Sequence, residues 1–351
     1  MKILIRGPIF NPTGFGTVNR EIARKLMKTD KIQSDDIFTS KYEFSKGLEK
    51  INNAIDIKNA NTLYSDYPQF WQKGVGKMVG HWVHEGTKLP QGYAQLINNS
   101  GISKLWVPSK ATYNLFKWND ILIPMKIIPY GVNDLYYPEK TKNDDFIFLS
   151  VNSWTGNLND RKGTDLLIKA FNEEFKLEEK VKLTLKIGTF FMNIPLQEYV
   201  KRINEICGRF NPNIMINNDY ITEKDLAEIY RKSDCFVSPT RGESFGLTML
   251  NAMASGIPLI CTHDINSGHM DYTNYDSVLY VDAPNVVQGD RQFFTEGCML
   301  ADPDLESLKK QMRYAFENKT KLKRKAMKNS KKIREKYTWE NTAKQVKELF
   351  K

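Results

Sequence analysis

One carboxylate stands in a short glycine-containing loop between a predicted buried strand and a predicted helix. Glu243 follows the apolar run Cys235–Val237, and Gly246 comes shortly after it, where the helix is expected to begin. Such a loop lies at the carboxyl edge of a parallel sheet, where ligands bind in folds of this kind. Its carboxylate can accept hydrogen bonds from hydroxyl groups, and free N–H groups at a helix N-terminus favour an anion. The loop therefore predicts a ligand site.

A second candidate loop near the N-terminus contains two glycines. The run Asn11–Thr17 follows the apolar segment Lys2–Ile5 and carries Gly14, Phe15 and Gly16. Glycines let the backbone approach a ligand closely. The run lacks the lysine of a P-loop and is not a full dinucleotide-binding fingerprint. Two hypotheses stay open: a phosphate-binding turn and an ordinary tight turn between strand and helix.

The loop around Glu243 resembles the signature of the retaining glycosyltransferases of family 4. That signature has a glutamate, Phe-Gly and Leu or Ile, then a second glutamate eight positions after the first, then Ala-Met-Ala-x-Gly-x-Pro. The matching residues here are Glu243, Ser244, Phe245, Gly246, Leu247 and Ala252–Pro258. The second glutamate is replaced by Asn251. The resemblance implies that Glu243 contacts sugar hydroxyls, that residues 244–247 line the sugar and phosphates, and that Asn251 meets the ribose.

The segment Asp160–Leu167 resembles the part of the family that holds the donor diphosphate. The resemblance implies that Lys162 neutralises the diphosphate leaving group. The assisting arginine of the family corresponds to Ser153, so we expect Arg161 to substitute for it. The competing hypothesis makes Arg161 and Lys162 ordinary surface charges. Tyr337–Trp339 also matches the family's ending, where the last helix crosses back to the first domain.

In the first half of the chain, Lys77–His84 is predicted to be a strand that runs into Glu85. Family members place a functional histidine or acidic residue at such a strand end, facing the bound sugar. By this resemblance His84 and Glu85 are catalytic candidates, against the alternative that His84 is structural. His81 lies deeper in the strand and is expected to be a hydrogen-bonded core residue.

No metal site is predicted, and no cofactor beyond the donor substrate. The histidines form no ligand-spaced set with cysteines. Asp302-Pro303-Asp304 mimics the Asp-x-Asp motif of metal-dependent glycosyltransferases. However, this motif directly precedes an amphipathic helix, so one of its aspartates is expected to cap that helix.

The resemblance implies an enzyme, a hexosyltransferase that uses a nucleotide diphosphate sugar of the UDP or GDP type. It implies retention of anomeric configuration without an obligatory metal, with a glycan, a lipid-linked molecule or another acceptor. The departures at Ser153 and Asn251 motivate the first alternative, a non-catalytic member that only binds sugar nucleotides. A nucleotide-sugar epimerase and a DNA-modifying glycosyltransferase are further alternatives.

Short apolar runs that alternate with amphipathic helices predict parallel α/β sheets. The expected strands are Lys2–Ile5, Phe146–Val151, Val181–Ile187, Asn213–Ile216, Cys235–Val237, Pro258–Cys261 and Ser277–Val281. We expect two Rossmann-like domains in the GT-B arrangement with a cleft between them. Residues 1–137 with a crossing helix at 338–351 would bind the acceptor, and residues 146–337 the nucleotide sugar. The polar stretch Pro138–Asp145 is the expected linker.

The net charge of +10 is concentrated in one segment, because Lys319–Lys336 holds ten lysines and arginines and one glutamate. A helix there would bury Leu322, Ala326 and Ile333 and expose its lysines. The alternatives are attraction to an anionic membrane surface or polyanion, and a solvated face. No apolar run is long enough to span a membrane, and the apolar N-terminal stretch is too short for a signal peptide. Four separated cysteines indicate free thiols, so we expect a cytoplasmic protein, peripheral at a membrane if the lysines bind one.

Overall fold

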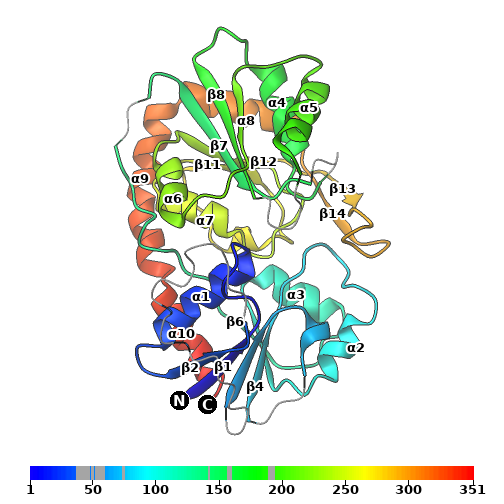
Figure 1. The fold of residues 1–351 in the computed structure, drawn as a ribbon. Helices are drawn as coiled ribbons and strands as arrows, with labels where there is room; N and C mark the ends of the chain where they lie inside the picture. Colours follow the sequence, from blue (N-terminus) through cyan, green and yellow to red (C-terminus); the bar gives the residue numbers. More distant parts are fainter. Residues whose placement is uncertain are drawn as a thin grey trace. The chain divides into compact units, whose positions relative to one another are not determined.

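The computed structural model describes residues 1–36, 48, 51, 60–72, 76–140, 143–155, 160–188 and 194–351. The chain divides into two compact units (Figure 1). The first comprises Met1–Gly131 and Tyr337–Lys351, and the second comprises Val132–Lys336. The expected linker at 138–145 falls inside the second unit by this division, and its residues 141 and 142 lie outside the described part of the chain.

The first unit is built on a parallel sheet of six described strands in the order β2-β1-β3-β4-β5-β6. The strands are β1 Lys2–Arg6, β2 Lys31–Ser34, β3 Asn61–Ser65, β4 Met78–His81, β5 Lys104–Val107 and β6 Met125–Ile127. The helices are α1 Gly14–Leu26, η1 Pro68–Phe70, α2 Tyr93–Asn98, α3 Lys110–Trp118 and α10 Trp339–Glu348. Helix α1 buries Val18, Ile22 and Leu26, as its spacing predicts.

The last helix returns to the first unit, as the resemblance implies. Helix α10 begins after Thr338, and the Thr342 hydroxyl donates to the Pro129 carbonyl at 2.8 Å. Glu340 forms an ion pair with Lys25 of α1. Gly131 lies so close that an added Cβ would meet the Trp339 nitrogen at 2.3 Å.

The second unit is built on another parallel sheet of six described strands, in the order β12-β11-β10-β7-β8-β9. The strands are β7 Phe146–Asn152, β8 Val181–Ile187, β9 Ile214–Asn217, β10 Cys235–Ser238, β11 Leu259–Thr262 and β12 Val278–Val281. The helices are α4 Thr164–Glu174, α5 Leu196–Cys207, α6 Glu223–Arg231, α7 Leu247–Ala254, η2 Gly268–Asp271, α8 Leu305–Glu317 and α9 Lys319–Lys336. Each strand coincides within a residue or two with a predicted apolar run, because both faces of a helix-covered parallel sheet are buried.

Several elements were not predicted. Strands β13 Asn285–Gln288 and β14 Met299–Asp302 form an antiparallel hairpin, and β13 is largely exposed, so it lacks an apolar run. The predicted strand 77–84 is wrong at its end, because β4 stops at His81. Its partner β3 stops at the paired residue Ser65, and the hydrogen-bond ladder ends with it.

All four cysteines are free thiols, as expected, with Cys207 half-buried and the other three buried. Within the described ranges, none of the helices combines the length and apolar character needed to cross a membrane.

Candidate active site

The loop that carries Glu243 connects β10 to α7 and is fixed by backbone geometry. Gly246 precedes α7 with a φ of +88°, which favours glycine. The Tyr272 hydroxyl donates to the carbonyls of Phe245 (2.9 Å) and Gly246 (2.6 Å), and a Cβ on Gly246 would lie 2.8 Å from that hydroxyl oxygen. The sequence therefore folds this loop tightly onto Tyr272, with Glu243 at the carboxyl end of β10.

A second loop joins β7 to α4 and carries Arg161 and Lys162. Gly163 has a φ of +67°, and a Cβ there would lie 2.0 Å from the Pro239 carbonyl oxygen. Only glycine allows the two loops to approach this closely. The Asp160 carboxylate accepts a hydrogen bond from the Thr164 amide at 3.1 Å, which satisfies one N–H at the start of α4.

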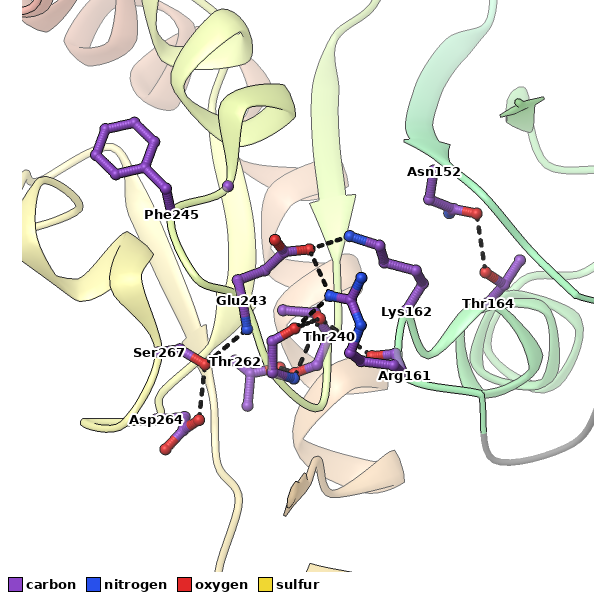
Figure 2. A network of polar contacts seen from close by, with 12 residues as sticks. Asn152, Arg161, Lys162, Thr164, Thr240, Glu243, Phe245, Thr262, Asp264 and Ser267 are labelled. Atoms are coloured by element: carbon purple, nitrogen blue, oxygen red, sulfur yellow. Dashed lines mark hydrogen bonds and ion pairs between the residues drawn. The ribbon is translucent and has the colours of Figure 1, made fainter. Parts of the chain in front are cut away.

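The two loops bring two cations to one carboxylate (Figure 2). Lys162 Nζ forms an ion pair with Glu243 Oε1, and Arg161 Nη1 lies 3.4 Å from the same oxygen. Arg161 also donates to the Gly242 carbonyl at 2.7 Å. The Glu243 side chain is 10% exposed, against 18% for Lys162 and 24% for Arg161. This cluster keeps one positive charge in excess at the sheet edge, which suits an anionic ligand.

Glu243 is held from its other side by the segment after β11. The Glu243 amide donates to Ser267 Oγ at 3.2 Å, and Ser267 Oγ donates to Asp264 at 2.7 Å (Figure 2). The Gly268 amide donates to the Glu243 carbonyl at 2.6 Å. Both backbone polar groups of Glu243 are thus satisfied, so the residue is placed independently of its carboxylate.

The remaining residues predicted for this site lie on the same loop and on α7. Ser244 and Phe245 are buried, and Phe245 packs on Tyr272 with ring centroids 5.1 Å apart. The Phe245 ring points away from Glu243 (Figure 2) and belongs to the core, so only its backbone can face a ligand. Leu247 and Asn251 are half-buried on α7, and Ser153 is exposed after β7.

Sequence reasoning missed the part that Arg241 plays in joining the two loops. Its side chain is 3% exposed, and its guanidinium contacts the Asp160 carbonyl at 2.6 Å and the Asp165 carboxylate at 3.3 Å. Burial, together with the neighbouring Asp165, raises the pKa of the Asp160 carboxyl. An arginine within the otherwise small and apolar run before Gly242 was the available signal.

The two glycines near the N-terminus do not form a loop, because they lie in the first turn of α1. Thr13 is the N-cap residue, and its hydroxyl accepts the Gly16 amide at 3.0 Å. A Cβ on Gly16 would meet Asn11 at 2.3 Å, whereas a Cβ on the exposed Gly14 would meet nothing. Phe15 packs edge-on against His81 at 5.9 Å. Their role in phosphate binding stays a prediction.

His81 is a hydrogen-bonded core residue, as expected. It is fully buried, with Nδ1 at 3.0 Å from the Trp106 carbonyl and Nε2 at 2.9 Å from the Tyr130 hydroxyl. Burial lowers its pKa to about 4. His84 is half-buried and stacks on Trp82 with centroids 5.4 Å apart, and Glu85 is also half-buried. Their catalytic roles stay predictions.

The Asp302–Asp304 motif does cap a helix. The Asp304 carboxylate accepts the Ser307 amide at 2.7 Å at the start of α8. Asp302 instead lies 3.8 Å from Arg241 Nε. Among the residues that the structure describes, no cluster of three or more His, Cys, Asp or Glu could hold a metal ion.

The sequence of the chain is similar to those of known proteins. Residues 151–289 match the family model of "Glycosyl transferases group 1". The chain is 33% identical over 108 residues to mannosylfructose-phosphate synthase of Agrobacterium fabrum, covering 30% of this chain and 24% of that protein. It is 25% identical over 255 residues to alpha-monoglucosyldiacylglycerol synthase of Streptococcus pneumoniae, covering 67% and 54%. The matches thus span less than two thirds of either relative.

Solved structures share the whole fold. The crystal structure of HepE from Anabaena in complex with UDP-glucose has a TM-score of 0.70 to this chain at 16% identity, covering 99% of this chain and 98% of that one. The likeness therefore extends over the folds of both units of this chain.

Proposed function

We propose that this chain, which has the GT-B fold and matches the group 1 glycosyltransferase family model at residues 151–289, transfers a hexose from a nucleotide diphosphate sugar to an acceptor. The observation that carries the proposal is the cluster of Lys162, Arg161 and Glu243 at the carboxyl edge of the second sheet. The UDP-glucose bound by HepE, a protein of the same fold, supports UDP as the first nucleotide to test.

In this proposal the two loops have different roles: the loop of Lys162 provides the cations that meet the diphosphate, and the loop of Glu243 provides the carboxylate that meets the sugar. Lys162, helped by Arg161, neutralises the negative charge that grows on the diphosphate as the glycosidic bond breaks. Glu243 accepts hydrogen bonds from sugar hydroxyls, and the backbone N–H groups at the start of α7 meet the phosphates. Anomeric configuration is retained, which does not require the carboxylate pair of glycoside hydrolases.

A panel of UDP, GDP, ADP and their sugars tests the donor assignment. A ligand that binds only the native state raises the unfolding temperature by mass action. We expect one nucleotide and its sugar to stabilise the protein. Incubation with that donor alone then separates the reaction classes, since an epimerase converts the donor and a transferase awaits an acceptor. A protein that no nucleotide stabilises would contradict the proposal.

A basic stripe on α9 favours an acceptor at an anionic surface. Lys321, Arg324, Lys328 and Lys332 are exposed, and none forms an ion pair with another described residue. Their spacing places them on the face opposite the buried Leu322, Ala326 and Ile333. We propose that this stripe attracts the protein to an acidic membrane that carries the acceptor. A lipid-glucosylating relative, alpha-monoglucosyldiacylglycerol synthase, supports a lipid over a nucleic acid.

A further inference from the structure

Arg241 is a buried cation at the junction of three segments of the second unit. Its Nη1 donates to the Asp160 carbonyl at 2.6 Å and lies 3.3 Å from the Asp165 carboxylate at the start of α4. Its Nε lies 3.8 Å from Asp302 at the end of β14. The side chain is 3% exposed, so it lies beneath the loops and not on their surface.

The backbone around Arg241 is joined to the same segments. The Arg241 amide donates to the Arg161 carbonyl at 2.7 Å, and its carbonyl accepts the Ala301 amide at 2.9 Å. The neighbouring Thr240 hydroxyl is 3.1 Å from the same Arg161 carbonyl. The loop of Lys162, the loop of Glu243 and the β13–β14 hairpin therefore meet at one residue.

Charge explains why a buried arginine is stable there. The Asp165 and Asp302 carboxylates pair with the guanidinium, and the Asp160 carbonyl accepts a hydrogen bond from it. A buried charge is tolerated only when it is paired and hydrogen-bonded in this way. Removing the guanidinium leaves the Asp160 carbonyl and the Asp165 carboxylate without this donor. The carboxylates would then repel one another and shift the segment that carries Lys162.

We propose that Arg241 is a positioning residue that sets Lys162 and Arg161 against Glu243 without touching the donor. The inference rests on the proposed donor site and adds to it the buried residue that holds that site in its binding geometry. A lysine does not replace Arg241, because its single ammonium nitrogen cannot lie beside the Asp160 carbonyl and the Asp165 carboxylate and also supply the Nε that faces Asp302.

The test measures UDP affinity by calorimetry for Arg241→Lys and Arg241→Met, each made in the wild-type chain and in Lys162→Met. If Arg241 acts through Lys162, both variants weaken UDP binding about tenfold or more in the wild-type chain and less than about threefold in Lys162→Met. The matched control is Arg313→Met on α8, which removes a guanidinium bound to Glu174 and Glu179, away from both loops.

Equal losses in both backgrounds, or a loss no larger than that of Arg313→Met, would overturn the proposal. Hydrogen exchange of the ligand-free protein gives a readout that does not depend on the nucleotide. We expect Arg241→Lys to speed exchange at the amides of residues 161–164, 241–243 and 301, and Arg313→Met to leave them unchanged. Unchanged exchange at these amides in Arg241→Lys also overturns the inference. Absence of UDP, GDP and ADP binding to the wild-type chain would instead count against the proposed function, with the exchange result deciding the role of Arg241.

Discussion

Lys162 and Glu243 lie 81 positions apart in the sequence and form a direct ion pair. The cation expected to meet the donor diphosphate thus already neutralises the carboxylate expected to meet the sugar. A bound diphosphate would compete with Glu243 for Lys162, and the freed carboxylate would then be available to sugar hydroxyls. The pair therefore links occupation of the phosphate site to preparation of the sugar site.

Glu243→Gln should keep nucleotide binding and lower turnover about a hundredfold. The loss of one charge-assisted hydrogen bond to the sugar costs roughly 2–3 kcal/mol in the transition state. UDP affinity should not fall, because Lys162 no longer pairs with a carboxylate. Steady-state turnover and calorimetry on the same preparation measure both, with Glu179→Gln, paired to Arg313, as the control. Turnover at the wild-type level would remove Glu243 from the mechanism.

Lys162→Met should weaken nucleoside diphosphate binding by about ten- to a hundredfold, because a hydrogen bond to a charged group is worth roughly 1.5–3 kcal/mol. Lys309→Met is a close control, since both lysine side chains are 18% exposed and both pair with glutamates. The affinity of Lys309→Met should match the wild type. If Lys162→Met and Lys309→Met bound nucleoside diphosphates with equal affinity, Lys162 would be an ordinary surface charge.

Each of the two donor loops could be predicted because its glycine and its charged residues are close together in the sequence. The strands of the second sheet could be predicted because both of their faces are buried, which gives each strand an apolar run. The role of Arg241 could not, since its carboxylate partner Asp165 is 76 positions away and only the fold brings them together. The end of β4 at His81 likewise depends on where β3 ends, which the apolar run Lys77–His84 does not encode. Gly14 and Gly16 were expected in a turn between the first strand and the first helix, where glycines let the backbone approach a ligand. The Thr13 cap instead starts α1 at Gly14.

Asn251→Ala should weaken nucleoside diphosphate binding by about 1 kcal/mol or more, if its amide replaces the family carboxylate at the ribose. Asn251 is half-buried on α7, eight positions after Glu243, so its side chain can be truncated without a large cavity. Calorimetry with UDP and with ribose 5-phosphate, which lacks the base, separates ribose contacts from base contacts. Unchanged UDP affinity would mean that the position has lost its role and would favour the non-catalytic alternative.

His81 should make the protein sensitive to acid. Its folded pKa of about 4 lies below the ordinary value of 6.5, so the unfolded chain binds the proton more readily. Stability from this group is present above pH 6.5 and is lost as the pH falls towards 4, by up to about 3 kcal/mol. Urea unfolding at pH 7 and pH 4 should show a smaller difference for His81→Gln than for the wild type. Exposed His263→Gln should behave as the wild type, and an equal pH dependence in His81→Gln would contradict the assignment.

The basic stripe of α9 should hold the protein at acidic lipid without a hydrophobic anchor. Each lysine near an acidic membrane contributes about 1 kcal/mol, and salt screens the attraction. Replacing Lys321, Arg324, Lys328 and Lys332 by glutamine should therefore abolish sedimentation with acidic vesicles at low salt. The control variant replaces four exposed lysines scattered over the same unit, which are Lys140, Lys176, Lys201 and Lys224. It carries the same net charge, so retained binding in the control would show that the stripe and not the total charge is recognised. Equal loss of binding in both variants would mean that the membrane responds to net charge alone.

Two further outcomes concern the wild-type protein. Displacement from the vesicles by trace duplex DNA would favour a polyanionic acceptor. Equal, negligible binding to acidic and neutral vesicles would mean that the exposed side of α9 is only a solvated face.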